Sequence, residues 1–267
     1  TYRFDDEYKW GTFWAVSGRW NIDQESFMEN AGFNMLKLRA SYGSTGNQNI
    51  DGQSIFSSAS NYKTLYGQLG SGYMNNPSYG VIQYGNPKIQ WETVVQANVG
   101  IDFVTLNRRL SGTVDYYEKV TKDMYIPFTL SAAAGTSSIN ANVGEMSNKG
   151  VEAMLRYELF PSTSDFQLSV TANGSYNKNR IENIASEDGR VDLTYQANQE
   201  GRTYNEFFLV RYAGVNAANG NALYYTADGQ LTEDPNEDTD RVLTGKSPLP
   251  VYQGGFGFDA SYKGFFL

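Results

Sequence analysis

The feature that most constrains this chain is a strict alternation of apolar and polar residues, sustained over segments of about ten residues. In one such segment the apolar positions alternate with polar or small ones: Val95, Ala97, Val99, Ile101 and Phe103 against Gln96, Asn98, Gly100 and Asp102. Residues 14–22 and 166–177 repeat the pattern. Period-two alternation of this length is typical of strands with one face in an apolar medium and the other in water. We therefore expect an all-β protein, a segment of an antiparallel transmembrane β-barrel.

Average hydropathy does not test this prediction. The mean hydropathy is -0.50, and no segment approaches the roughly 20 apolar residues that a membrane helix needs. A barrel strand escapes hydropathy averaging because every second residue is polar. Aromatic residues make up 15% of the chain, and several lie near expected strand ends, where barrels carry aromatic girdles: Trp20, Tyr42, Trp91, Tyr157, Phe160, Tyr262 and Phe265.

The composition also excludes several functions. The chain contains no Cys and no His, which removes disulfides, thiol chemistry, the commonest general base and the commonest transition-metal ligand. The 29 acidic residues single out no catalytic carboxylate pair, so we expect no enzymatic activity. The net charge of -8 disfavours a nucleic-acid groove, because phosphate binding needs clustered Lys and Arg.

About ten strands are expected from the alternation, with Gly, Pro, Asn and Asp clusters as boundaries: 12–22, 35–43, 93–105, 110–120, 149–159, 166–179, 204–215, 221–226, 253–262 and 265 onward. Short connections at 106–109, 160–165, 216–220 and 263–264 alternate with long ones at 44–92, 121–148, 180–203 and 227–252. Outer-membrane barrels show this asymmetry, with short periplasmic turns and long extracellular loops. Residues 23–30 are expected to form one or two helical turns on the short-turn side.

Four segments, in order, resemble the SusC/RagA family of TonB-linked outer-membrane transporters: 36–48 (LKLRASYGSTGNQ), 85–93 (GNPKIQWET), 115–123 (DYYEKVTKD) and 148–152 (NKGVE). The resemblance implies a barrel of about 22 strands with a plugged lumen. Residues 1–267 would then form the C-terminal part of one barrel domain, without the N-terminal plug and the TonB box.

The same resemblance implies a location in the Gram-negative outer membrane, surrounded by its lipids, and a set of partners. These are a SusD-like surface lipoprotein, the TonB complex reached through the N-terminal region, and a second transporter–lipoprotein pair. The implied cargo is an oligosaccharide or, less often, a peptide.

The candidate ligand-binding residues are five tyrosines of the loop 44–92: Tyr62, Tyr66, Tyr73, Tyr79 and Tyr84. Aromatic faces beside amide and hydroxyl groups suit carbohydrate, because a sugar offers an apolar C–H face and a rim of hydroxyls. A loop of this length also needs its own packing, and the same tyrosines can provide it.

Two further sets of charged residues each have a possible function and also a simpler structural explanation. The acidic run 233–240, with Asp228 and Gly229 before it, could offer oxygen ligands to Ca²⁺, the one cofactor considered. It lacks EF-hand spacing, and charge runs commonly form solvated loops. Lys37, Arg39 and Arg156 are expected to line the lumen and to pair with carboxylates across neighbouring strands.

Two other classes of protein stay open at this point. A secreted β-sandwich that binds glycans would be a soluble monomer without detergent. A passive outer-membrane porin would conduct without TonB.

Overall fold

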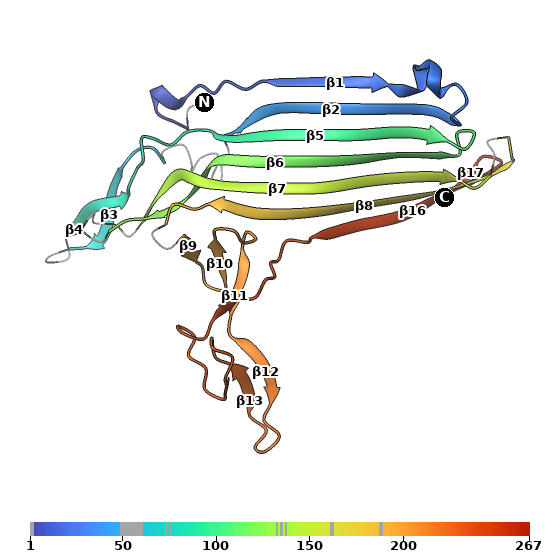
Figure 1. Cartoon of the computed structure of the whole chain (residues 1–267). Coiled ribbons are helices and arrows are strands. Elements are labelled where there is room, and N and C mark those ends of the chain that lie inside the picture. Colours follow the sequence, from blue (N-terminus) through green and yellow to red (C-terminus); the bar gives the residue numbers. More distant parts are fainter. Residues whose placement is uncertain are drawn as a thin grey trace.

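The computed structural model describes residues 3–48, 61–72, 74, 76–131, 133, 136, 138–160, 163–186 and 189–267. Its main feature is one open antiparallel sheet, here called the wall, with the strand order β1-β2-β5-β6-β7-β8-β16-β17 (Figure 1). The strands of the wall are β1 (Ala15–Asn21), β2 (Phe33–Asn47), β5 (Glu92–Thr105), β6 (Leu110–Thr129), β7 (Ser138–Glu158), β8 (Phe166–Asn183), β16 (Tyr252–Tyr262) and β17 (Phe265–Phe266). Eight of the expected segments therefore form neighbouring strands, which confirms the barrel-type sheet.

The connections differ at the two ends of the wall (Figure 1). At the short-turn end, short connections link β5 to β6, β7 to β8 and β16 to β17. The helical turn expected at 23–30 is present there as two 3-10 helices, η2 (Ile22–Gln24) and η3 (Ser26–Met28). The Leu36 backbone N–H donates to Asp23 Oδ1 at 3.2 Å, which fixes this turn to the start of β2. The other end, the long-loop end, carries the N-terminal 3-10 helix η1 (Asp6–Tyr8) and the hairpin of β3 (Leu65–Ser71) and β4 (Pro77–Gln83).

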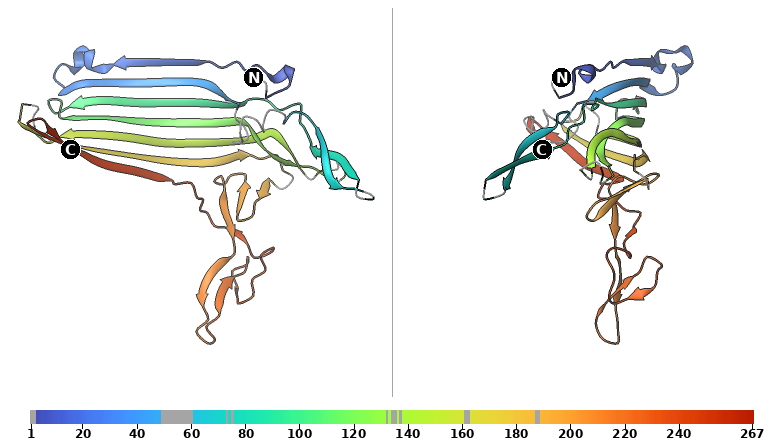
Figure 2. Two further views of the ribbon diagram at one scale, coloured as in Figure 1. Left: turned by 180° about the vertical axis from the view of Figure 1, so that it is seen from behind. Right: turned by 90° about the vertical axis from the view of Figure 1, so that its left-hand side faces the viewer.

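The prediction that 204–215 and 221–226 are strands of the wall is wrong. Both lie within one excursion between β8 and β16 that projects from the long-loop part of the wall (Figure 2). Two small sheets form it: β15-β11-β10-β9, and β12-β13-β14. Their strands are β9 (Arg190–Asp192), β10 (Gln196–Gln199), β11 (Glu206–Leu209), β12 (Arg211–Val215), β13 (Ala222–Tyr225), β14 (Leu231–Thr232) and β15 (Val242–Leu243). None reaches the roughly nine residues that a strand needs to cross a bilayer.

The long connection expected over 121–148 consists largely of paired strands. The β6–β7 ladder continues past Lys122 to the pair Thr129 and Ser138, with register shifts near Met124. This part of the chain contains little Gly and has apolar residues such as Met124, Ile126 and Ile139, and its two strands extend beyond the neighbouring ones. The wall is therefore taller at β6 and β7 than at β1 or β16 (Figure 1).

The register separates the side chains of the wall into two faces. One cross-strand row is largely apolar: Gly18, Ala40, Val99, Tyr116, Val151, Tyr176 and Tyr252. The next row along the strands, on the opposite face, is charged or polar: Arg19, Arg39, Gly100, Asp115, Glu152, Ser175 and Gln253. We call the sides that these rows lie on the apolar face and the polar face.

The apolar face is uncovered in this chain. Val16 is 62% exposed and Phe256 is 90% exposed, and large side chains of every long wall strand lie open on this face. The apolar run of β8 extends from Phe166 to Tyr176, which at about 3.3 Å per residue and a tilt near 40° spans about 25 Å. That is the height of the apolar band of an outer-membrane barrel.

Aromatic side chains mark both borders of this band. Near the long-loop end Tyr176 and Tyr252 pack with ring centroids 5.1 Å apart, and Trp14 packs on Tyr42 at 5.5 Å. At the short-turn end the Arg109 guanidinium lies 5.2 Å from the Tyr157 ring, and the Lys263 amine lies 5.3 Å from the Tyr262 ring. Rings with a polar edge or a neighbouring cation suit the headgroup region.

Trp91 was expected in a girdle and instead belongs to a small buried cluster at the long-loop end. Its ring packs against Phe4 at 5.8 Å and Phe13 at 5.6 Å. A second cluster buries Ile181 and Phe208 between the end of β8 and the excursion. The buried cores thus lie above the apolar band, in the part that water surrounds. Among the described residues no helix is long and apolar enough to cross a membrane.

Substitution on the two faces of β8 should have opposite consequences. Val170 is on the apolar face in the middle of the band, and Thr171 is on the polar face beside Gly257. We expect Val170→Arg to reduce the free energy of unfolding by about 2–4 kcal/mol, because the charge enters the lipid. Thr171→Arg, the matched control, should change it little. The measurement is urea unfolding of the whole protein in lipid vesicles, and equal effects of the two changes would contradict the assignment of the faces.

Candidate functional site

The polar face is organised around an ion-pair network at its centre. Arg39 on β2 donates from Nε to Asp102 Oδ2 at 2.8 Å and from Nη2 to Asp102 Oδ1 at 2.9 Å. The same Nη2 donates to Asp115 Oδ2 on β6 at 3.1 Å. A guanidinium suits this double contact because its N–H groups form a rigid planar fork. The network links three adjacent strands, and it confirms the prediction that Arg39 pairs with a carboxylate across a neighbouring strand.

Glycine on the intervening strand makes this crossing possible. Gly100 on β5 lies between Arg39 and Asp115 in the register. A Cβ at Gly100 would overlap Asp115 Oδ1 and lie 2.8 Å from Arg39 Nη2. Gly150 has the same role on β7, where the Tyr117 hydroxyl donates to Asn177 Oδ1 at 2.9 Å. Any side chain at either position would displace these contacts.

A hollow of about 450 Å³ lies beside the network, over β6, β7, β8 and β16. Asp115 and Glu152 face this hollow from directly opposed positions on β6 and β7. Gly255 on β16 also lines it and, having no side chain, leaves the hollow deep there. The Glu152 side chain forms no hydrogen bond or ion pair with another residue in the described part of the chain. Two opposed carboxylates with one guanidinium give this part of the polar face a negative potential.

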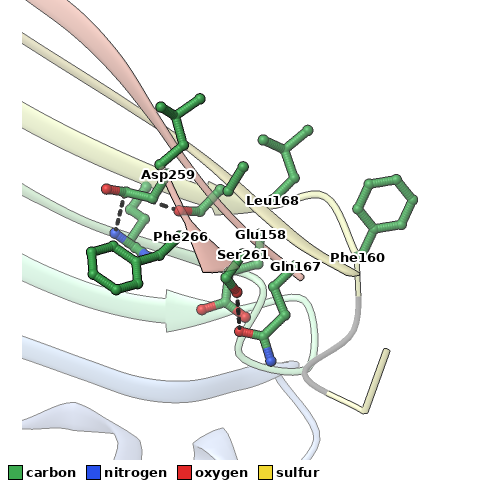
Figure 3. A pocket seen from close by; sticks show the side chains of 11 residues that line it. Glu158, Phe160, Gln167, Leu168, Asp259, Ser261 and Phe266 are labelled. Atoms are coloured by element: carbon green, nitrogen blue, oxygen red, sulfur yellow. Dashed lines mark hydrogen bonds and ion pairs between the residues drawn. The ribbon is translucent and has the colours of Figure 1, made fainter. Parts of the chain in front are cut away.

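A second hollow, of about 380 Å³, lies near the short-turn end (Figure 3). Arg156 Nη1 lies 3.1 Å from Asp259 Oδ2, which also accepts from the Ser169 hydroxyl at 3.2 Å. Ser261 Oγ lies 3.5 Å from Gln167 Oε1 in the same view (Figure 3). Arg156 therefore lines the polar face and has a carboxylate partner, as predicted.

At the long-loop end, the excursion packs against the polar face of the wall. Asn179 and Ile181 follow Ser175 on the polar face of β8. The Tyr204 backbone N–H donates to Asn179 Oδ1 at 2.9 Å, and the Ile181 N–H donates to the Arg202 carbonyl at 2.8 Å. Between this segment and β6 lies an apolar cavity of about 160 Å³, lined among others by Met124, Ile126, Ile184 and Leu193.

The structure brings two of the five predicted tyrosines together. Tyr66 is paired with Val81 and Tyr79 with Gln68, so Tyr66 and Tyr79 are diagonal neighbours on one face of the β3–β4 hairpin. They are 74% and 73% exposed. Leu69 and Ile82 fill the other face, over Gly80 and Gly67.

The other tyrosines are placed differently. The Lys63 amine lies 5.1 Å from the Tyr62 ring, so this tyrosine contacts its own loop. Tyr84 comes directly after β4 and lies outside the β3–β4 ladder. Tyr73 lies outside the described residues. The ligand-binding role of all five stays a prediction.

The acidic run 233–240 is held by amide groups. Glu233 accepts from Asn221 and Asn219 at 2.7 Å each and also from Asn216, while Asp240 accepts from the backbone N–H of Asn236 at 2.9 Å. In the part of the chain that the structure describes, no three acidic side chains converge into a metal site. Calcium binding here stays a prediction.

Comparison with known proteins decides the family. A family model described as "TonB dependent receptor-like, beta-barrel" matches residues 1–265. The chain belongs to this family. TonB-dependent receptor P39 of Formosa agariphila is 32% identical over 318 residues, which cover 99% of this chain and 29% of that receptor. TonB-dependent receptor SusC of Bacteroides thetaiotaomicron is 25% identical, over 98% of this chain and 28% of that receptor.

Solved structures agree with the family assignment. The structure of the RagAB peptide transporter matches with a TM-score of 0.85 and 29% identity, over 99% of this chain and 29% of that chain. The RagAB peptide importer in its "open-open" state matches with a TM-score of 0.85 as well. This receptor chain thus spans less than a third of the length of the relatives it matches. The resemblance to SusC/RagA and the location in the outer membrane are confirmed.

Some functional features were not predicted from the sequence. The bridging contact of Arg39 with Asp115 and the opposed pair of Asp115 and Glu152 depend on register. The apolar cavity at Met124 and Leu193 depends on how the excursion packs against the wall. Alternation gives the face of each residue but not its neighbour on the next strand. A partial signal did exist for the network: Arg39, Asp102 and Asp115 are charged residues at polar positions of three amphipathic segments.

Removal of Arg39 should destabilise the receptor. Arg39→Gln leaves Asp102 and Asp115 without their shared cation, and because the site is partly solvated we expect a loss of about 1–2 kcal/mol in the free energy of unfolding. A second change, Asp115→Asn, should restore part of the loss. Arg19→Gln is the matched control, since Arg19 is opposite Arg39 and has no ion-pair partner among the described residues. Urea unfolding in vesicles measures all three, and no rescue by Asp115→Asn would contradict the account.

Glu233 should make the excursion pH-sensitive. Hydrogen bonds from Asn221, Asn219 and Asn216 lower the pKa of Glu233 below its ordinary value of 4.5. A depressed folded pKa means that the stabilisation is complete above about pH 4.5 and is lost as the pH falls through the lower folded value. We expect hydrogen-exchange protection of 215–225, corrected for intrinsic rates, to fall in that range. Glu233→Gln should remove the pH step, and an unchanged step in this variant would refute the assignment.

Proposed function

We propose that this chain forms part of the wall and mouth of a SusC-like importer, which takes up oligosaccharides or peptides together with a surface lipoprotein. The observation that carries the proposal is the composition of the polar face. It holds an ion-pair network, an uncompensated Glu152 and two hollows, as expected for a wall that contacts other polar groups. A passive pore needs only water on this side.

The occupant of the polar face, in this proposal, is the plug of the whole receptor. Relatives more than three times as long as this chain have room for such a domain. The negative hollow at Asp115 and Glu152 suits a cationic side chain of the plug, and the low floor at Gly255 suits close approach of its backbone. TonB would act on the plug, outside this chain.

The long-loop end is the surface proposed for cargo and for the lipoprotein. It carries the β3–β4 hairpin, the tall β6–β7 hairpin and the excursion, so its area is large and its elements are ordered into sheets. Ordered sheets lose less conformational entropy on binding than flexible loops do. If two transporter–lipoprotein units pair, they would do so through surfaces other than those proposed here for cargo and lipoprotein.

Two observations point to different cargo. The exposed pair Tyr66 and Tyr79 offers aromatic faces for sugar stacking. The apolar cavity at Met124, Ile126 and Ile184 instead suits an apolar amino-acid side chain, and the structures similar to this chain include a peptide importer. Peptide is therefore the second candidate.

Neither other class of protein fits as well. A soluble sandwich would cover the apolar face with a second sheet, whereas here that face is open along the wall. The match to the TonB-dependent receptor family over residues 1–265 argues against a passive porin.

The tyrosine pair provides the test of the cargo. In the full-length receptor with its lipoprotein, we expect Tyr66→Ala with Tyr79→Ala to weaken binding of an oligosaccharide cargo on the order of tenfold, because two stacking faces are lost. Tyr66→Phe with Tyr79→Phe is the matched control and should retain the affinity. Uptake of labelled oligosaccharide and peptide pools by cells, with and without TonB, is the measurement. Equal uptake with and without TonB would overturn the proposal of an energised importer. Unchanged uptake by the alanine variant would show that the two tyrosines are not part of the cargo site.

A further inference from the structure

On the long-loop side of the aromatic border, the next row of side chains on the apolar face is charged. On β6, β7 and β8 the border row is Tyr116, Val151 and Tyr176, and the next outward-facing row is Glu118, Lys149 and Lys178. The row is continuous because these residues are register partners. It lies on the long-loop side of the apolar band, which is the outer leaflet in an outer-membrane barrel. These side chains are therefore at headgroup depth, on the side that faces lipid and not the lumen.

Two lysines are directly opposed in this row. Lys149 and Lys178 are register partners on β7 and β8, and like charges in directly opposed positions are unfavourable. Glu118 binds Lys149 at 2.8 Å from the β6 side. The Lys178 side chain is exposed and has no hydrogen bond or ion pair with any residue that the structure describes. Glu118 thus neutralises Lys149, whereas Lys178 has no counter-charge among the described residues.

We propose that Lys149 and Lys178 bind a phosphate group of a phosphorylated glycolipid in the outer leaflet. A phosphate between the two amines would neutralise the opposed charges and accept charge-assisted hydrogen bonds from both. The acyl chains of the same lipid would lie along Val151 and Tyr176 on the apolar band below. The binding site is thus a corner between a charged row and an apolar surface.

The geometry favours a lipid over a free anion. The site opens outward at the membrane border and is not on the polar face, where cargo would pass. The chain as a whole has a net charge of -8, so its exposed loops repel soluble anions. An amphiphile held by its tails at this depth reaches the lysines at a high effective concentration.

Native mass spectrometry of the full-length receptor in detergent tests the proposal. The probes are monophosphorylated lipid A, the same lipid without phosphate, and phosphatidylglycerol. We expect the receptor to prefer phosphorylated lipid A, and Lys149→Gln with Lys178→Gln to weaken its binding on the order of tenfold. Lys178→Gln alone, which leaves the pair of Lys149 and Glu118 intact, should show part of that loss.

Two further variants separate a specific site from a general effect of charge. Lys263→Gln removes a lysine that lies beside Tyr262 at the opposite membrane border, and it should leave binding unchanged. Glu118→Gln frees Lys149 and should strengthen binding, a gain that a misfolded protein could not produce. Equal binding by the double variant, by lipid A without phosphate or by phosphatidylglycerol would overturn the proposal.

Discussion

The structure depends on one constraint: each backbone N–H and C=O within an apolar medium must find its hydrogen-bond partner on a neighbouring strand. That requirement explains why the strands of the wall are long, continuous and antiparallel through the band marked by Phe166 and Tyr176. Regularity ends where water is available. Register shifts, small sheets and 3-10 turns all lie beyond the band, where unpaired groups can be solvated. Closure of the barrel requires that β1 and the opposite edge also pair with further strands.

The two faces of the wall satisfy different energetic demands. The apolar face needs only hydrophobic side chains, since lipid supplies the contacts. The polar face has to hold buried or half-buried charge, and it does so by pairing across strands, with Gly100 and Gly150 providing the space. Glu152 on one face and Lys178 on the other have no side-chain partner among the described residues, and both side chains are exposed. They are the positions on which the proposals for the plug and for the outer-leaflet lipid rest.

The sequence predicted the wall well because alternation is a direct consequence of a strand between lipid and water. It failed at 204–215 and 221–226, because a small sheet with Glu206 and Phe208 buried also alternates, and only the length of its strands distinguishes it. It missed the strands within 121–148 because beyond the apolar band the residues no longer alternate strictly between apolar and polar. The pairing of Arg39 with a carboxylate could be predicted from face and position. The opposed pairs of Asp115 with Glu152 and of Lys149 with Lys178 could not, because they depend on registers that a single strand does not specify.

The most direct test of the account is a scan of β8 with single cysteines from Phe166 to Tyr176, carrying spin labels, in the full-length receptor in lipid. Residues 1–267 contain no Cys, and any cysteine elsewhere in the receptor is replaced first, so each label reports one position. The account predicts that access to dissolved oxygen and to a water-soluble nickel reagent alternates with period two. Leu168, Val170 and Ala172 should be oxygen-accessible, and Gln167, Ser169 and Thr171 should not. A scan without alternation, or with its phase reversed, would contradict the assignment of lipid and lumen to the two faces.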